Sequence, residues 1–524
     1  MCFYHSLILF ATAMLLYLYW SFKNAYKFFE HRGIPFVKPS SLLFGNMADV
    51  IFMRTTLPEK YVQFYKQLAP HKFGGILTMK KPTIVFRDPE LIKKILIKDF
   101  ASFTDRGFNT VRKIEPLSHS LFTMKGDEWK TLRVKLSNSF SSGKMKMMFP
   151  ILKECGEKLS RVIEEINVNR TFDVKDLASR YTTDTVGSCV LGLGSNSLDN
   201  PNSEFRKIGE KIFVFRYAAF FRSIWTNMPE TLIKLFNITL INPTIQKRFA
   251  KMIDDTIKYR EENNISRNDF MDRMIALKSQ VSSQIPNDVE EDKDLQKFVD
   301  QVGQKYLRSN KHIDITNDLL AAQAFVFFAG GFGVTAITLS NILLELSLNG
   351  GIQDKVRQEI FHVLSSNGGE LTYDNMKQMT YTDMVIAETL RKYPPAAVLF
   401  REAGENYKIP DTDVIIPAGT SIIVPTYGIH LDELFYENPT EFRPERFTAE
   451  EKAKRSSCTY LPFGEGPRIC IAERFANLQV KVGLIYAIKN FTYRVSPEMK
   501  LPMEYRKVFG LLNPESGILL QRQK

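Results

Sequence analysis

Residues 462–476 have the sequence PFGEGPRICIAERFA, in which a turn rich in glycine and proline leads into a helical pattern. Cys470 lies where that helix is predicted to begin. The unpaired amides and the dipole of a helix N-terminus favour a thiolate over a thiol, and Arg468 adds positive charge nearby. A sulfur held in this way is suited to bind a metal or to act as a nucleophile. The helical pattern itself rests on apolar residues at helical spacing, namely Ile471, Phe475, Leu478, Val482 and Ile485.

Taken alone, the residues around Cys470 leave several interpretations open. An isolated cysteine on an amphipathic helix is most often a small buried apolar residue. The loop lacks the Gly-Lys-Ser/Thr ending of a phosphate-binding loop. A cysteine nucleophile would need a histidine partner, and no histidine lies near Cys470 in the sequence, although the fold could bring one close.

The string that runs from Phe463 through Gly466 and Arg468 to Cys470 resembles the haem-binding loop of the cytochrome P450 family. This resemblance implies that Cys470 is the axial thiolate ligand of the iron in haem b. It also implies that Phe463 packs on the thiolate side and that Arg468 pairs with a haem propionate. Ala472 stands where the family usually has glycine, and we expect this methyl group to be tolerated.

Two further positions resemble the propionate-binding residues of the family. Trp129 and Arg133 are four residues apart and therefore share a helix face. By itself such a pair is typical of any amphipathic helix, but the resemblance assigns both residues to the haem carboxylates. Arg401 falls at another propionate position, and the planar fork of arginine matches a carboxylate well.

A buried ionic network is the third part of the resemblance. Glu388 and Arg391, together with Arg446 in the segment 442–447, match the Glu/Arg/Arg network that holds the haem-binding loop of the family in place. We expect these residues to be structural. His430 also falls at a familiar position, where a structural role is favoured over iron ligation.

The segment 314–348 is predicted to be a long central helix, capped by Asp314 or Thr316 and ended by the glycines after Asn349. Its residues 321–328 resemble the central helix of insect microsomal P450s that metabolise xenobiotics.

After that run the family has a small-Gly-x-acid-Thr motif, in which the acid and the threonine organise proton delivery to bound oxygen. Here Gly333 and Val334 replace the acid and the threonine. Gly331 and Gly333 allow a helix bulge, and Thr335 is the candidate substitute for the missing hydroxyl. The sequence therefore supports haem binding more strongly than ordinary monooxygenation.

The first 22 residues contain no Asp, Glu, Lys or Arg, and a stretch of about 20 apolar residues spans a bilayer. We expect an uncleaved signal anchor at 1–22, because the segment lacks the basic start and the small-residue cleavage site of a signal peptide. Basic residues from Lys23 to Arg32 then place the rest of the chain in the cytoplasm, and the resemblance to microsomal P450s implies the endoplasmic reticulum membrane. We assign 23–40 to a basic, proline-containing hinge and 41–524 to one catalytic domain.

The composition fits a large globular domain. The chain has 524 residues, 44% of them hydrophobic, and its five cysteines show no short-range pairing, which indicates a reducing compartment. A net charge of +12 suits an acidic protein partner or an anionic membrane, and no nucleic-acid motif accompanies it. The predicted fold is mainly α with a minor β sheet, including a hairpin at 75–86. The apolar segment 213–241 is a candidate access lid, and 279–311 is predicted to be an exposed connection.

Together these motifs imply a cytochrome P450 fold, with a single haem-thiolate domain behind a membrane anchor. The resemblance implies a monooxygenase that inserts one atom of O₂ into a lipophilic small molecule, either a xenobiotic or an endogenous lipid or hormone. Electrons would come from NADPH through NADPH-cytochrome P450 reductase, with cytochrome b5 as an optional second donor. Two alternatives stay open: an isomerase or dehydratase of the P450 type, which needs no proton relay, and a non-enzymatic haem protein that sequesters ligands.

Overall fold

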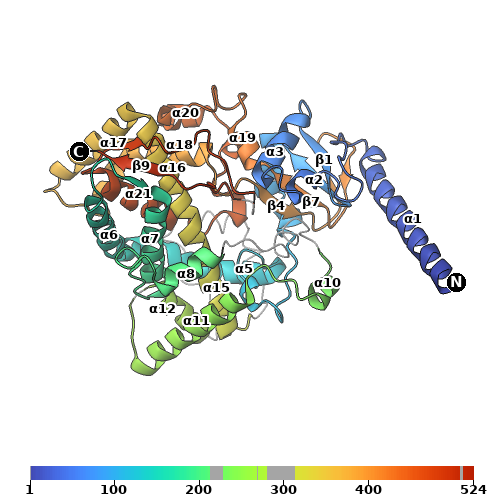
Figure 1. Cartoon of the computed structure of the whole chain (residues 1–524), viewed down its shortest axis with the longest axis horizontal. Coiled ribbons are helices and arrows are strands. Elements are labelled where there is room, and N and C mark those ends of the chain that lie inside the picture. The colour runs from blue at the N-terminus through green and yellow to red at the C-terminus, as the bar shows by residue number, and fades with distance from the viewer. Residues whose placement is uncertain (1, 213–227, 268, 280–312, 508–510, 524) are drawn as a thin grey trace.

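The computed structural model describes residues 2–212, 228–267, 269–279, 313–507 and 511–523 (Figure 1). Most of the predicted access lid, residues 213–227, and nearly all of the predicted connection at 279–311 lie outside these ranges. The described chain is predominantly helical with small sheets, which confirms the predicted fold class.

The helices gather around one apolar core. Helices that contribute to this core include α6 (Ser142–Glu164), α7 (Val174–Val186), α11 (Pro243–Asn263), α17 (Gly350–Ser365), α18 (Thr380–Lys392) and α21 (Glu473–Ile488). The largest apolar cluster is built mainly from their inward faces. Burial of such faces is the main favourable term for a fold of this size.

A central helical segment runs through this core (Figure 1). It consists of α15 (Asn317–Ala329), a π-helical segment, η7 (Gly330–Val334), and α16 (Thr335–Leu348). Thr316, and not Asp314, caps its start, because the Thr316 hydroxyl accepts a hydrogen bond from the Leu319 amide at 3.2 Å. The π-helical segment contains three glycines, whose freedom lowers the cost of leaving α-helical geometry.

Among the described residues, the helix over Asn317–Leu348 is long and apolar enough to cross a membrane, yet 67% of its most apolar window is buried inside the protein. It is therefore best explained as the core helix.

The main sheet has the strand order β1-β2-β7-β4. The strands β1 (Phe73–Thr78) and β2 (Lys81–Phe86) form the predicted antiparallel hairpin. The strand β7 (Ser421–Val424) runs parallel to β2 and antiparallel to β4 (Leu399–Glu402). Strand β4 carries Arg401, so this sheet positions one of the candidate site residues.

Two smaller sheets complete the strands of the described chain. One joins β3 (Thr171–Asp173), β9 (Leu519–Arg522) and β8 (Tyr493–Val495), and the other pairs β5 (Tyr407–Lys408) with β6 (Ile415–Ile416).

The N-terminal helix α1 (Cys2–Glu30) extends away from the body of the molecule (Figure 1). Its last turn is tied to the main sheet, since Phe29 is fully buried and stacks on Phe36 with ring centroids 5.3 Å apart. A Cβ atom at Gly75 of β1 would lie 2.2 Å from the Phe29 ring, so glycine is needed for this approach.

Candidate functional site

Cys470 lies in a loop between η11 (Gly466–Arg468) and α21, so the helix begins three residues later than the sequence predicts. The Cys470 amide donates to the Phe463 carbonyl at 3.0 Å and closes the loop. Gly466 has φ +75°, and a Cβ atom there would lie 1.9 Å from the Leu96 carbonyl oxygen, so this position requires glycine. The Phe463 ring packs against the main apolar core.

The expectation that local charge favours the Cys470 thiolate is wrong for the protein alone. Burial raises the pKa of the thiol above its ordinary value, and this outweighs the lowering caused by an Ala472 backbone hydrogen bond and by Arg133 and Arg106. The residue nevertheless retains exposed surface in the protein alone. Ala472 has a φ of −100°, which any residue can adopt, so its methyl group causes no backbone strain.

Four arginines form one group beside this thiol: Arg133 and Arg106 act on the pKa of Cys470 directly, and Arg401 and Arg468 are close enough to Arg106 for its charge to lower their pKa values. Burial lowers the pKa of Arg106 and of Arg133 to about 10 and that of Arg401 to about 9. The pKa of Arg468 also falls well below its usual range, for the same reason. Arg106 lowers the pKa of each of the other three by repulsion, so its charge lies near all of them.

Arg468 and Trp129 form a stacked pair inside the protein. The Arg468 guanidinium lies 3.7 Å from the centre of the Trp129 ring, which is buried in α5 (Gly126–Ser137) together with Arg133. Arg468 also donates to the carbonyls of Thr104 and Met124, each at 2.8 Å, and pairs with Asp105 at 3.5 Å. Arg468 therefore directs much of its hydrogen bonding to carbonyls of the loop 104–124.

Arg401 is held differently. Its Nη1 donates to the Phe400 carbonyl at 2.8 Å, while its buried Nε has no hydrogen-bond partner within the described part of the chain. A buried donor without an acceptor costs free energy. Three buried arginines, the half-buried Arg106 and the unused Arg401 Nε match a ligand that carries two carboxylates, and the Cys470 sulfur matches its metal. The residues present therefore fit haem.

The fold brings together the three residues of the predicted ionic network, Glu388, Arg391 and Arg446. Both Glu388 oxygens accept from Arg391, at 2.7 and 2.8 Å, and Arg446 Nε lies 3.3 Å from Glu388. All three side chains are buried. The Arg443 amide also donates to Glu388, at 3.0 Å, which ties α18 to η9 (Pro444–Phe447).

His430 connects this network to the cysteine loop. Its Nδ1 lies 3.1 Å from the Arg391 carbonyl, and its Nε2 accepts from the Leu461 amide at 2.9 Å. Because both ring nitrogens bind the backbone, neither can serve an iron. Burial lowers the pKa of His430 to about 3, so the ring is neutral. The structural interpretation of His430 is therefore the one that the geometry supports.

The π-helical segment η7 contains Gly331, Gly333 and Val334 and leads into Thr335. Thr335 is buried at the start of α16. Thr338, one turn further along, donates to the Val334 carbonyl at 3.0 Å. The predicted bulge is thus present, and the Thr338 hydroxyl is occupied by the helix backbone.

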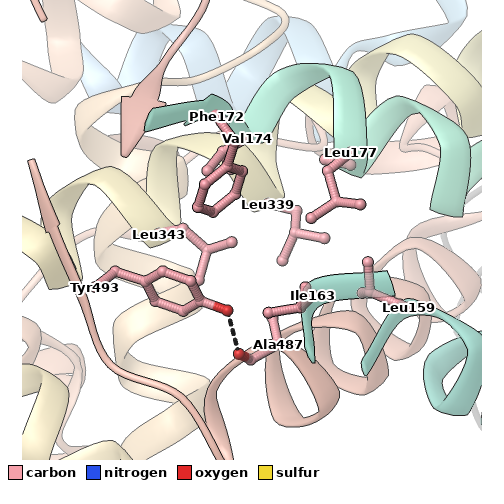
Figure 2. A pocket seen from close by; sticks show the side chains of 10 residues that line it. Leu159, Ile163, Phe172, Val174, Leu177, Leu339, Leu343, Ala487 and Tyr493 are labelled. Atoms are coloured by element: carbon pink, nitrogen blue, oxygen red, sulfur yellow. Dashed lines mark hydrogen bonds between the residues drawn. The ribbon is translucent and has the colours of Figure 1, made fainter. Parts of the chain in front are cut away.

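A small apolar cavity of about 10 Å³ lies elsewhere, between α6, α7, α16 and α21 (Figure 2). Its lining includes Leu159, Leu177, Leu339 and Tyr493, whose hydroxyl donates to the Ala487 carbonyl at 2.5 Å. Ligand pockets are typically about 300–1,000 Å³. We attribute this cavity to imperfect core packing and not to substrate binding.

Sequence reasoning missed Arg106. Its Nη1 donates to the Phe122 carbonyl at 2.8 Å, its Nη2 donates to the Arg468 carbonyl at 3.2 Å, and its guanidinium lies 4.5 Å from the Phe122 ring centre. A single arginine in a loop has no spacing pattern that would indicate this position.

Comparison with known proteins agrees with this geometry. Residues 35–522 match the family model for cytochrome P450. Cytochrome P450 6k1 of Blattella germanica is 36% identical over 516 residues, which cover 98% of this chain and 96% of that protein. Probable cytochrome P450 6a19 of Drosophila melanogaster is 36% identical over 517 residues, which cover 98% of this chain and 97% of the relative.

Proposed function

Because the chain belongs to the cytochrome P450 family, we propose that it oxidises lipophilic small molecules, xenobiotics above all, at a haem b group bound through Cys470. It is an oxidoreductase of the monooxygenase type. The observation that carries the assignment of the site is the buried Arg401 Nε without a partner among the described residues, in a group of arginines whose members Arg133 and Arg106 act on Cys470.

The chain's own residues divide the work of binding the cofactor. When bound, haem iron supplies the redox chemistry that activates O₂. We assign the axial thiolate to Cys470, and the neutralisation of the two haem carboxylates to Arg133, Arg401 and Arg106. Trp129 and Arg468 support this group from the loop side, because their contacts are mainly with the loop 104–124 and with each other.

The ionic network has a structural task in this proposal. Breaking one partner of a buried ion pair costs about 3–5 kcal/mol, so Glu388, Arg391 and Arg446 strongly favour one position of α18 relative to η9. His430 links Arg391 of this network to Leu461, at the start of the cysteine loop, through one hydrogen bond on each ring nitrogen. The sulfur is thereby held at a fixed place before the cofactor binds.

As a P450, the protein takes electrons from a redox partner such as P450 reductase. We propose that cytochrome b5 can act as a second donor and that the endoplasmic reticulum membrane is the working location. The net charge of +12 favours acidic partners of this kind.

The test is reconstitution of the purified protein with NADPH-cytochrome P450 reductase and a panel of coumarin ethers, from methoxy to benzyloxy. We expect a thiolate-type ferrous carbonyl spectrum and NADPH-dependent release of hydroxycoumarin. Product only from organic hydroperoxides, without NADPH, would indicate the isomerase or dehydratase instead. A normal carbonyl spectrum with bound ligands and no product under either condition would indicate a sequestering protein.

A further inference from the structure

The two ends of the loop 104–124 are joined by one side chain, that of Arg468. It donates to the carbonyl of Thr104 at 2.8 Å, at the first end. At the other end it donates to the carbonyls of Leu121 and Met124, at 3.3 and 2.8 Å. The Arg468 side chain is buried, so no water competes for these bonds. The shape of the loop therefore depends on where this guanidinium lies.

The middle of the same loop is bonded to α11 and to the residues just before it. Glu115 is fully buried, and its Oε1 accepts a hydrogen bond from the Ile241 amide at 2.6 Å. Gln246, in the first turn of α11, is also buried, and its Oε1 accepts from the Leu117 amide at 3.3 Å. A buried amide without an acceptor is costly, so these two bonds favour one position of the loop relative to α11.

An apolar contact adds to these hydrogen bonds. Val111 of the loop is buried with Met228 and Ile233 in a small cluster separate from the main core. Ile233 belongs to α10 (Glu230–Leu235), which precedes α11. The loop therefore holds the whole segment 228–246 by polar and apolar contacts, and this segment includes the described part of the predicted access lid.

The ends of the loop also respond to the charge of the site beside Cys470. In the protein alone, Arg468 is repelled by three other cations, namely Arg106, Arg133 and Arg401. Arg106 lies at one end of the loop and donates to the Arg468 carbonyl at 3.2 Å. Two carboxylates bound among these arginines would replace repulsion by attraction. The loop ends are therefore held together less strongly in the empty protein than in the loaded one.

We propose that Glu115 couples haem loading to the position of the segment 228–246. With the site empty, the loop ends separate more readily, and the bonds from Ile241 to Glu115 and from Leu117 to Gln246 open more often. With haem bound, both bonds stay closed. Glu115 is a positioning residue, because it acts through the loop and not on the cofactor. The inference rests on the haem binding proposed above and is independent of the reaction that follows.

The first test is hydrogen exchange at the Ile241 and Leu117 amides. It is measured by mass spectrometry, with fragmentation to single residues, on the full-length apo-protein and on the haem-loaded protein. Amides that exchange through local opening report the stability of that contact alone. We expect haem to slow exchange at both amides about 10-fold, since coupling between two sites is typically about 5- to 150-fold.

A matched pair of amides controls for general stabilisation by a bound ligand. Glu359 of α17 accepts from the Tyr381 and Thr382 amides, at 2.7 and 2.8 Å, and so ties α17 to the start of α18. These amides are also bonded to a carboxyl side chain, but they lie outside the loop 104–124. Haem should slow their exchange much less than that of Ile241.

The second test uses the reciprocity of coupling. If haem closes the contact, removal of the contact must weaken haem binding by the same factor. In titrations of the apo-protein, Glu115→Leu should therefore lower the affinity for haem by the factor by which haem slows Ile241 exchange in the wild type. Gln246→Leu, which breaks the second bond from α11, should act in the same direction. Glu115→Gln keeps an acceptor oxygen and should stay near the wild-type affinity.

Glu359→Leu is the control variant, and it should lower the melting temperature without changing the affinity for haem. Equal exchange at Ile241 with and without haem would overturn the inference, as would unchanged haem affinity in both Glu115→Leu and Gln246→Leu. In either case a thiolate-type spectrum of the loaded wild type would leave the proposed function standing. A chain that binds no haem would contradict the proposed function, and the inference with it.

Discussion

Arg106 is expected to stabilise the haem-bound protein and to destabilise the apo-protein. Its guanidinium repels three other buried arginines, and it also lies near the thiol at Cys470. Two haem carboxylates would turn that repulsion into attraction. The Arg106→Gln variant should therefore act in opposite directions on the two states.

We predict that Arg106→Gln raises the melting temperature of the apo-protein and speeds the loss of haem about 10- to 100-fold, since a hydrogen bond to a charged group contributes about 1.5–3 kcal/mol. Haem loss is measured by transfer to apomyoglobin. Arg112→Gln is the control, because Arg112 is an exposed arginine of the same loop that donates to Thr316 at 3.3 Å. If haem leaves both variants at the same rate, Arg106 has no part in cofactor binding.

The pKa of Cys470 predicts how the apparent affinity for haem depends on pH. Because burial raises the pKa of its thiol, the apo-protein carries a proton there at neutral pH, and binding of iron must release it. Apparent haem affinity should therefore rise by about tenfold per pH unit from about pH 7 to about pH 8.5. Above that range the gain should fade, because the pKa of Arg401 is about 9 and its charge begins to be lost.

Haem titration of the apo-protein, followed by absorbance at each pH, measures this slope. Cys470→Ala should show no such slope and no thiolate-type carbonyl spectrum. A flat pH profile in the wild type would mean that the thiol is already ionised, and a thiolate-type spectrum in Cys470→Ala would refute the ligand assignment.

At the scale of elements, the approach of α7 to the central helix depends on Gly331. A Cβ atom at this position would lie 2.7 Å from Cγ2 of Val186, whereas a Cβ atom at Gly330 would meet no atom within 4 Å. Two adjacent glycines of the same π-helical segment therefore have different tasks. Gly331 permits a helix contact, while Gly330 only loosens the backbone.

We predict that Gly331→Ala lowers the free energy of unfolding by about 1–3 kcal/mol through overpacking against Val186. Gly330→Ala should be neutral or should stabilise by up to about 1 kcal/mol, because alanine favours a helix over glycine. Denaturant unfolding of the two variants measures the difference. Adding Val186→Ala should remove most of the penalty of Gly331→Ala, and an additive loss in the double variant would contradict the contact.

Local motifs explain why many of these elements could be predicted. The hairpin at 75–86, the network of Glu388, Arg391 and Arg446, and the long central helix each depend on residues that are close in sequence or match a known pattern. The start of α21 could not be placed, because the loop around Gly466 extends to Ala472 before the helix begins. The π-helical geometry leaves no trace in hydrophobic periodicity, which reports only which face is buried.

At the scale of the whole molecule, the site is assembled from segments that are far apart in the chain. Arg468 donates to the Thr104 carbonyl across 364 residues, and this contact brings Arg106 next to the cysteine loop. Sequence spacing contains no information about such a contact. The same limit explains the error on the Cys470 pKa, because the sequence shows the nearby Arg468 but not the burial that dominates.

Membrane attachment is the prediction that concerns the whole chain. Helix α1 has 29 residues and is about 43 Å long at 1.5 Å per residue, longer than the hydrocarbon core of a bilayer. Among its described side chains, Ile8 is 63%, Leu9 69% and Leu16 63% accessible. Exposed apolar surface of this extent is unfavourable in water, and a lipid bilayer would cover it.

We predict that deletion of residues 2–22 moves most of the protein to the soluble fraction after ultracentrifugation of a cell lysate. A minor bound fraction should remain, because Leu235 and Phe236, 74% and 66% accessible at the end of α10 (Glu230–Leu235), offer a second apolar contact. Adding Leu235→Ser and Phe236→Ser should release this fraction. Leu434→Ser, at an equally exposed leucine elsewhere, should not. A truncated protein that stays fully bound through a high-salt wash would show that α1 is not the anchor.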